Sequence, residues 1–427
     1  MNPAISIEQR RLKYAATIND ESLTEATETD YELQYIDIGN VDSYGTVHDV
    51  VAYKFEDAPS RARRIARHGD VIVSTVRTYL QAIAPIENHP ENLIVSTGFA
   101  VVRPKGNLFD ARFCKYAVRE KHFLWEVESR STGVSYPAIN ASDLADIRVN
   151  LPDVETQRLI ADYLDRETAR IDALVAEKET MLALLEEKRA ALISSAVTRG
   201  LVPTAPLKPS GLDWLGDIPA HWEVWKLKYV VEKIGSGITP RGGAESYQSE
   251  GIPLFRSQNI HFDGLRMDDI VYVDAETHES MSNSKVLEGD VLINITGASI
   301  GRCFYIENLQ GEANVNQHVC IVRPAPKIEA KFLYFTLRSD VGQHQIDLTQ
   351  SGSGREGLNF ESLGNFSVVI PSLSEQLAII QRLEAAGNRS TELLNEIRNS
   401  TELLKERRAA LITAAVTGQI PVEEMSA

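Results

Sequence analysis

The chain has 427 residues, a length that allows two or three domains. Its hydrophobic content of 43% and charged content of 24% are ordinary for a soluble globular protein. The formal net charge of −16 at pH 7 argues against a protein that coats nucleic acid without sequence preference, although local basic surface can still bind phosphates. No apolar run approaches the length of a membrane span, and the N-terminus lacks the apolar core of a secretion signal, so we expect a cytoplasmic protein.

Residues 1–152 predict a first globular domain of mixed strands and helices. Short segments rich in β-branched residues, such as DVIVSTV at 70–76 and IRVNLP at 147–152, are bounded by turn residues. Their length and composition are typical of strands in a mixed sheet.

Residues 153–199 predict one long helix. The stretch after Asp153 contains no Pro or Gly and is rich in strong helix formers. Leu164, Ile171, Leu185 and Leu192 follow a heptad spacing, which favours a coiled-coil-like seam. Asp153 can cap the start of this helix, and Gly200 stands where a C-terminal glycine is expected.

The second half of the chain predicts the same succession of elements. Residues 200–226 are rich in Pro, Gly and Trp and form a linker that leads into a second globular domain at 227–371. A second long helix is expected at 372–418, where Ser372 and Glu375 form a capping-box pattern, and 419–427 form a tail.

The two long helices match at a constant offset of 219 residues, and the domains match at an offset of 219–220. The offset pairs Gln157 with Gln376, and it pairs RAALI at 189–193 with RAALI at 408–412. Two amphipathic helices can look alike by chance, but matches at unlike residue types favour an internal duplication. Gly-Asp-Val at 69–71 and Val-Arg-Pro at 102–104 also return, at 289–291 and 322–324, where they indicate shared turns and strand ends. The sequence therefore predicts an α/β (α+β) fold with two similar globular domains, each followed by a long helix. The two helices are expected to form an antiparallel coiled-coil spacer with pseudo-two-fold symmetry.

Sequence motifs of catalysis are missing. The chain has no GxxxxGK[ST] phosphate loop, no Gly-x-Ser-x-Gly elbow and no Asp/Asn-Pro-Pro-Tyr/Phe motif of amino-methyltransferases. Its nine histidines form no HExxH motif, and Cys114, Cys303 and Cys320 have no metal-ligand spacing. We therefore expect no catalytic residue, no metal site and no cofactor.

Two similar domains at a fixed separation suit a double-stranded DNA target with two half-sites. In the first domain, Arg61, Arg63 and Arg64, with Arg67, predict a basic patch that touches phosphates; a plain helix face is the alternative. Side chains in loops can read bases or bind phosphates. The first domain offers seven such residues: Arg77, Thr78, Tyr79, Thr132, Gly133, Ser135 and Tyr136. The second domain offers nine more: Arg256, Ser257, Asn259, Thr296, Ser299, Arg302, Gln317, Ser353 and Arg355. For each of them, an ordinary surface loop is the alternative.

Three groups of motifs carry a family resemblance that covers nearly the whole chain. They are the segment SGLDWLGDIPAHWEVWKL at 210–227, the helix openings LPDVETQ and IPSLSEQ, and the helix ends KRAALISSAVTRG and RRAALITAAVTGQ. With these motifs, the sequence resembles the specificity subunit of a type I restriction–modification system. One departure is that the first half lacks a counterpart of the WLGDIPAHW segment.

The resemblance implies two target-recognition domains, each of which reads one part of a split double-stranded DNA site. The helices would set the gap between the parts and dock two modification subunits, which methylate adenine with S-adenosylmethionine. A restriction subunit with translocase and endonuclease activity would complete the complex, and the chain itself would be non-catalytic. The alternative is a non-catalytic protein-interaction scaffold with two heads on a coiled coil, which the net charge of −16 would suit.

Overall fold

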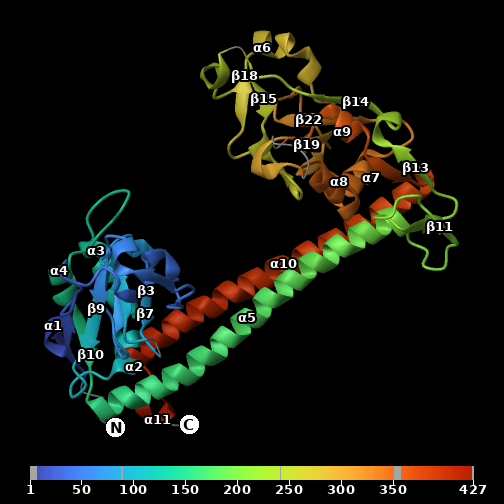
Figure 1. Cartoon of the computed structure of the whole chain (residues 1–427). Coiled ribbons are helices and arrows are strands. Elements are labelled where there is room, and N and C mark those ends of the chain that lie inside the picture. The colour runs from blue at the N-terminus through green and yellow to red at the C-terminus, as the bar shows by residue number, and fades with distance from the viewer. Residues whose placement is uncertain (1–6, 88–89, 241, 351–356, 426–427) are drawn as a thin grey trace. The chain divides into compact units, whose positions relative to one another are not determined.

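The computed structural model describes residues 7–87, 90–240, 242–350 and 357–425. It divides into two compact units, Met1–Glu179 with Arg398–Ala427, and Thr180–Ile397. Each unit contains one globular head and one end of each of the two long helices, α5 (Val154–Arg199) and α10 (Leu373–Val416) (Figure 1). The chain therefore crosses from one unit to the other inside a helix. Within the described residues, no helix combines the length and the apolar character that a membrane span requires.

Head 1, residues 7–151, contains two four-stranded sheets. The first has the order β2-β9-β6-β7 and is antiparallel, with strands Ala16–Ile18, Phe99–Pro104, Val71–Ser74 and Ile83–Pro85. The second has the order β4-β3-β8-β5, with strands Val51–Lys54, Glu32–Ile36, Leu93–Ser96 and Ala62–Ile65, and its β3–β8 pair is parallel. Strand β1 (Glu8–Arg11) pairs with β10 (Arg148–Leu151) and closes the head beside the start of α5. The helices of this head are α1 (Leu12–Ala15), α2 (Ala111–Ala117), α3 (Lys121–Arg130) and α4 (Ala141–Ala145).

Head 2, residues 223–370, repeats this strand order except for the strand that would correspond to β5. Its four-stranded sheet has the order β14-β22-β19-β20, with strands Val231–Ser236, Val319–Pro324, Val291–Asn294 and Cys303–Tyr305. A three-stranded sheet, β18-β15-β21, contains Val271–Val273, Ile252–Phe255 and Asn314–Val315, and its β15–β21 pair is again parallel. Strand β13 (Glu223–Lys226) pairs with β23 (Ser367–Ile370), as β1 pairs with β10. Its helices are α6 (Ala275–Ser280), α7 (Ala330–Arg338), α8 (Asp340–Gln350) and α9 (Phe360–Gly364). The predicted two-domain α/β fold is confirmed.

The repeated helix ends dock into the cores of the heads. In the first unit, Ile412, Ala415 and Val416 of α10 are buried among the core residues of head 1, together with Ile160 and Leu164 of α5. In the second unit, the matching residues of α5 are buried among the core residues of head 2: Ile193, Ala196 and Val197. Burial of these apolar side chains explains why the RAALI and AVT motifs recur.

The predicted caps are confirmed at both ends of α5 and at the start of α10, whereas α10 ends at Val416, two residues before the predicted end at 418. Asp153 accepts a hydrogen bond from the backbone N–H of Thr156 at 2.9 Å, and Gly200 has a φ of +74°. At the start of α10, Ser372 Oγ accepts from the N–H of Glu375, and the Glu375 carboxylate accepts from the N–H of Ser372. This is the reciprocal capping box.

Two buried contacts are duplicated with the heads. Gln157 and Gln376 are fully buried, and each anchors a long helix to its own head through three backbone hydrogen bonds. Arg103 donates two hydrogen bonds to the carboxylate of Asp70, and Arg323 does the same to Asp290. The repeated Gly-Asp and Arg-Pro motifs mark turns and strand ends, as predicted, and they also pair with each other.

Candidate nucleic-acid interface

Two loops of head 1 that are far apart in sequence form one structure, which we call loop pair 1 (residues 75–81 and 131–139). The N–H of Ile139 donates to Thr75 O at 2.9 Å, and the hydroxyls of Thr78 and Ser131 are 2.8 Å apart. Val76 and Ala138 form a β-bridge. The structure thus brings together the two segments of head 1 in which the loop residues were predicted.

Loop pair 1 exposes a basic and aromatic surface. Arg77 has a left-handed φ of +52°, which directs the chain out of strand β6 into the short turn η3 (Thr78–Leu80). Its guanidinium carbon lies 5.0 Å from the ring centre of Tyr136, which is 65% exposed, and Tyr79 is 56% exposed. Thr132, Gly133 and Ser135 are exposed as well, whereas Thr78 is buried against Ser131. Stacked Arg and Tyr side chains with open faces can contact phosphates or base edges.

Two arginines of the basic segment 61–67 pair with acidic residues that precede it. It lies on and beside strand β5, not on a helix, so the alternative of a helix face is wrong. The Arg63 side chain packs over Phe55 at 4.7 Å and lies 3.5 Å from Glu25, while Arg67 pairs with Glu21 at 2.8 Å.

Among the other arginines of this segment, Arg64 is half-buried and its Nε has no hydrogen-bond partner in the described residues. Burial lowers the pKa of Arg64. Arg61 is exposed. Arg61 therefore remains a candidate for contact with DNA.

Three loops gather at the corresponding end of head 2. The amide Nδ2 of Asn294, at the end of β19, donates to Ser257 O at 2.8 Å and lies 3.1 Å from Ser299 Oγ. Thr296 Oγ1 lies 2.6 Å from His318 Nδ1, and Gln317 contacts the other nitrogen of the same ring at 2.9 Å. Thr296, Ser299, Arg302 and Gln317, all half-buried, thus come together. Asn294 and His318 were not predicted to take part, although a polar residue that ends a buried apolar strand is a signal for the former.

One second-domain prediction needs correction, and two others fall outside the described residues. Asn259 is fully buried, accepts from the N–H of Arg256 and donates to Arg266 O, so it closes a turn and leaves no polar atom free for DNA. Arg256 is half-buried, donates to Asp269 O and lies 5.7 Å from the ring centre of Tyr247, and it stays a predicted DNA contact. Ser353 and Arg355 lie outside the described residues.

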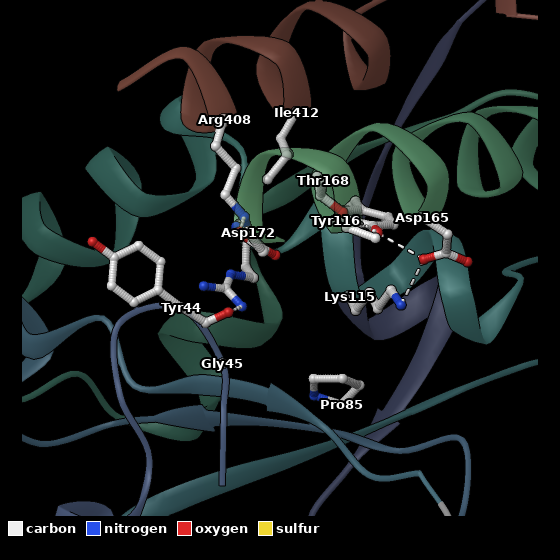
Figure 2. A pocket seen from close by; sticks show the side chains of 12 residues that line it. Tyr44, Gly45, Pro85, Lys115, Tyr116, Asp165, Thr168, Asp172, Arg408 and Ile412 are labelled. Carbon is white, nitrogen blue, oxygen red and sulfur yellow. Dashed lines mark hydrogen bonds and ion pairs between the residues drawn. The ribbon is translucent and has the colours of Figure 1, made fainter. Parts of the chain in front are cut away.

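A pocket of about 250 Å³ lies at the junction of head 1 with α5 and α10 (Figure 2). Asp165 of α5 lies 2.8 Å from Lys115 Nζ and accepts from the hydroxyl of Tyr116 at 2.7 Å (Figure 2). Arg119 donates to the carbonyls of Ser43, Tyr44 and Ile83. Burial, reinforced by nearby Arg408, lowers the pKa of Arg119 to about 10. Lys115 pairs with Asp165, and Arg119 is held by backbone carbonyls, so the pocket lies within the contact between head 1 and the helices.

Comparison with known proteins places this arrangement in a family. The family model described as "Type I restriction modification DNA specificity domain" matches residues 26–182 and 219–403. The chain belongs to this family. The two copies of the specificity domain correspond to the duplication described above.

Relatives of this specificity-domain family cover most of the chain. The type I restriction enzyme EcoBI specificity subunit of Escherichia coli is 24% identical, over 90% of this chain and 86% of its own length. The MjaVIII specificity subunit of Methanocaldococcus jannaschii is 21% identical, over 78% of this chain and 76% of its own. A solved structure described as "Structural basis underlying complex assembly and conformational transition of the type I R-M system" shares the fold. It has a TM-score of 0.74 and 22% identity over 97% of this chain and 98% of that one.

Proposed function

We propose that this chain is the specificity subunit that directs a type I restriction–modification complex to a bipartite double-stranded DNA site. Each head reads one half-site. The observation that carries the proposal is that the two heads share one framework but differ in their loops. Loop pair 1 follows strand β6, and the loop at 295–302 follows the matching strand β19. The N–H of Leu358 donates to Ile295 O in head 2 as that of Ile139 donates to Thr75 O in head 1.

The polar loop residues divide into those that fit bases and those that fit phosphates. Arg77 can form a bidentate pair with guanine, and Gln317 can do so with adenine if it leaves His318. Exposed hydroxyls such as those of Ser135 and Tyr136 suit phosphates or base edges. Because the sequences of the loops differ between the heads, the two half-sites would differ as well.

The long helices would hold the heads at a set separation and dock the partner subunits. Apolar side chains remain exposed along both helices: Leu159, Leu174, Met181, Leu184, Leu373, Leu377, Leu393 and Leu403. Contiguous exposed apolar surface marks sites for protein partners, and we propose that these residues contribute to such surfaces. We propose that the partners are two modification subunits, which methylate adenine with S-adenosylmethionine, and restriction subunits with the translocase and endonuclease. The chain itself would be non-catalytic and would act in the cytoplasm.

The test is co-expression of the chain with its modification subunits, followed by mapping of methylated adenines in the host DNA. The intact chain should give one split motif. Exchange of residues 207–371 for the corresponding domain of another specificity subunit should change one half of this motif and leave the other half as it was. An unchanged motif, in a variant that still assembles and methylates, would contradict the proposal. Binding should also weaken steeply with salt, because the contacts to DNA include phosphates, whereas a protein scaffold would be less sensitive.

A further inference from the structure

A buried histidine in head 2 faces two carboxylates. His278 lies in α6, which follows strand β18 at the edge of the three-stranded sheet (Figure 1). Its side chain is 1% exposed, and its Nδ1 is 2.5 Å from Oδ1 of Asn314 in β21. Asn314 is itself fully buried.

The hydrogen bonds of Asn314 determine which ring nitrogen of His278 carries the proton. The amide Nδ2 of Asn314 donates to Met281 O at 3.2 Å and to Ser284 Oγ at 2.8 Å. Its Oδ1 must therefore accept from Nδ1–H of His278. In the neutral imidazole, the lone pair is then on Nε2, the nitrogen that faces the carboxylates.

This Nε2 atom is buried and has no hydrogen-bond partner among the described residues. Glu312 Oε1 is 3.2 Å away and Glu279 Oε1 is 3.8 Å away, and the three atoms lie within 4.8 Å of one another. The separation from Glu312 is short enough for a hydrogen bond, but the geometry is not that of one. A lone pair and two carboxylate oxygens that converge without bonding to each other form a set of donors for a cation.

We propose that His278, Glu279 and Glu312 bind a divalent transition-metal ion. One imidazole nitrogen and two carboxylate oxygens suit Zn²⁺, Mn²⁺ or Co²⁺ better than Ca²⁺ or Mg²⁺, which prefer oxygen ligands throughout. Asn314 orients the imidazole in the way that outer-shell partners of metal-bound histidines do. Water would complete the coordination, because both glutamates are largely exposed.

Lys285 competes with the ion for this site. Its Nζ lies 2.7 Å from Glu279 Oε1 and 4.0 Å from Glu312 Oε1, so its single charge leaves one carboxylate uncompensated. The ion would displace this ammonium group toward solvent. The competing explanation is a doubly protonated His278 that pairs with Glu312, and in that case no metal would bind.

The site would join α6 to the segment just before β21, and the described residues of head 1 contain no equivalent. The position that matches Asn314 in the parallel β3–β8 pair is Ile94, a buried apolar residue. The sequence predicted no metal site because Glu312 is distant along the chain from the adjacent pair His278 and Glu279. This inference is independent of the DNA-reading function.

Isothermal titration of the full-length, chelator-treated chain with Zn²⁺ alone tests the proposal. We expect one site that the double variant Glu279→Gln/Glu312→Gln weakens by more than the roughly 10- to 100-fold that loss of one outer-shell partner costs, since it removes two direct ligands. Both substitutions are at exposed positions, so the variant should fold, which circular dichroism can check. Glu276→Gln, at an exposed position of the same helix, should bind Zn²⁺ as the unmodified chain does.

Lys285→Ala gives a second measurement, in which the affinity for Zn²⁺ should rise and not fall. Removal of the competing ammonium should tighten Zn²⁺ binding several-fold, and Co²⁺ at the same site should give a visible absorption spectrum that the double variant lacks. Equal Zn²⁺ binding by the double variant and the unmodified chain would overturn the proposal. So would the absence of binding at millimolar Zn²⁺, or an unchanged affinity in Lys285→Ala.

Discussion

Arg408 of α10 donates two hydrogen bonds to the carboxylate of Asp172 in α5, at 2.8 Å and 3.3 Å. The matching arginine of the other repeat, Arg189, has Thr391 where Asp172 would stand, and within the described residues no ion pair of Arg189 is present. Burial lowers the pKa of Arg189, and nearby Arg338 adds to this effect. The duplicated helices are therefore joined by an ion pair in one unit and not at the matching position of the other.

We expect the Asp172–Arg408 pair to show a coupling of about 0.5–1 kcal/mol in a double-mutant cycle of Asp172→Asn and Arg408→Met. Asp172 is about half exposed, so solvent screens much of the attraction. Urea unfolding of the four proteins measures the coupling. Arg189→Met is the matched control and should be neutral or slightly stabilising, because it removes a half-buried cation without a carboxylate partner. A large loss of stability in Arg189→Met would show that this comparison is wrong.

The two buried glutamines make the same three backbone contacts in their own units. Gln157→Leu should destabilise the first unit by about 2–4 kcal/mol, because it leaves the N–H of Asp110 and the carbonyls of Leu108 and Pro152 without partners. Hydrogen exchange read by mass spectrometry should show faster exchange in head 1 and at the start of α5. Gln376→Leu is the mirror experiment and should affect head 2 instead. If either variant increased hydrogen exchange equally in both heads, each glutamine would not act on its own head alone.

The lowered pKa of Glu375 predicts that the stability of the start of α10 depends on pH. Burial opposes its ionisation, but hydrogen bonds from His221, Ser372 and Trp222 prevail and lower the pKa of Glu375 to about 2. Because the folded-state pKa lies below the ordinary value of 4.5, its ionised form stabilises the fold above about pH 4.5. This stabilisation is lost as the pH falls from about 4.5 toward 2.

The measurement is urea unfolding of the unmodified chain and Glu375→Gln between pH 7 and pH 3.5. The difference in unfolding free energy between the unmodified chain and Glu375→Gln should be constant near neutral pH and should shrink below about pH 4.5. Ser372→Ala keeps the Glu375 carboxylate but removes one of its hydrogen-bond donors. Its difference in unfolding free energy from the unmodified chain should be smaller than that of Glu375→Gln and should also shrink below about pH 4.5. A difference that widens in acid would mean that the pKa of Glu375 is raised instead.

The sequence predicted those features that depend on neighbours along the chain. The long helices, the cap at Asp153 and the capping box at Ser372 follow from local spacing, and the duplication follows from a gapless offset. Long-range pairing was not predictable in this way. Asp70 and Arg103 are 33 residues apart, and neither motif indicates that the other is its partner.

In the candidate interface, too, contacts between residues far apart in the chain could not be predicted from the sequence. The arginines at 61–67 looked like a basic patch, yet Glu21 and Glu25 fold back onto two of them. Asn259 was predicted as one of the loop residues that read bases or bind phosphates. Its counterpart Asn40 also accepts a hydrogen bond from the backbone N–H three residues earlier, so both repeats use this asparagine to close a turn. Only the tertiary contacts separate such structural residues from exposed ones like Arg77 and Tyr136.

Arg77 and Arg63 provide a matched pair for testing the DNA surface of head 1. Arg77 is exposed beside Tyr136, whereas Arg63 is mostly covered by Phe55 and faces Glu25. Arg77→Ala should therefore weaken specific DNA binding by about 10- to 100-fold and relax base preference in the half-site of head 1, since one good base contact contributes about 1–3 kcal/mol. Arg63→Ala should change affinity much less.

Binding should be measured on the chain assembled with its modification subunits, at fixed salt, with DNA libraries randomised in one half-site at a time. Arg302→Ala in head 2 is the reciprocal variant and should relax the other half-site only. If Arg77→Ala lowered affinity uniformly over all sequences and reduced the salt dependence, Arg77 would be a phosphate contact. If Arg63→Ala had the larger effect, the DNA surface of head 1 would lie on strand β5 and not on loop pair 1.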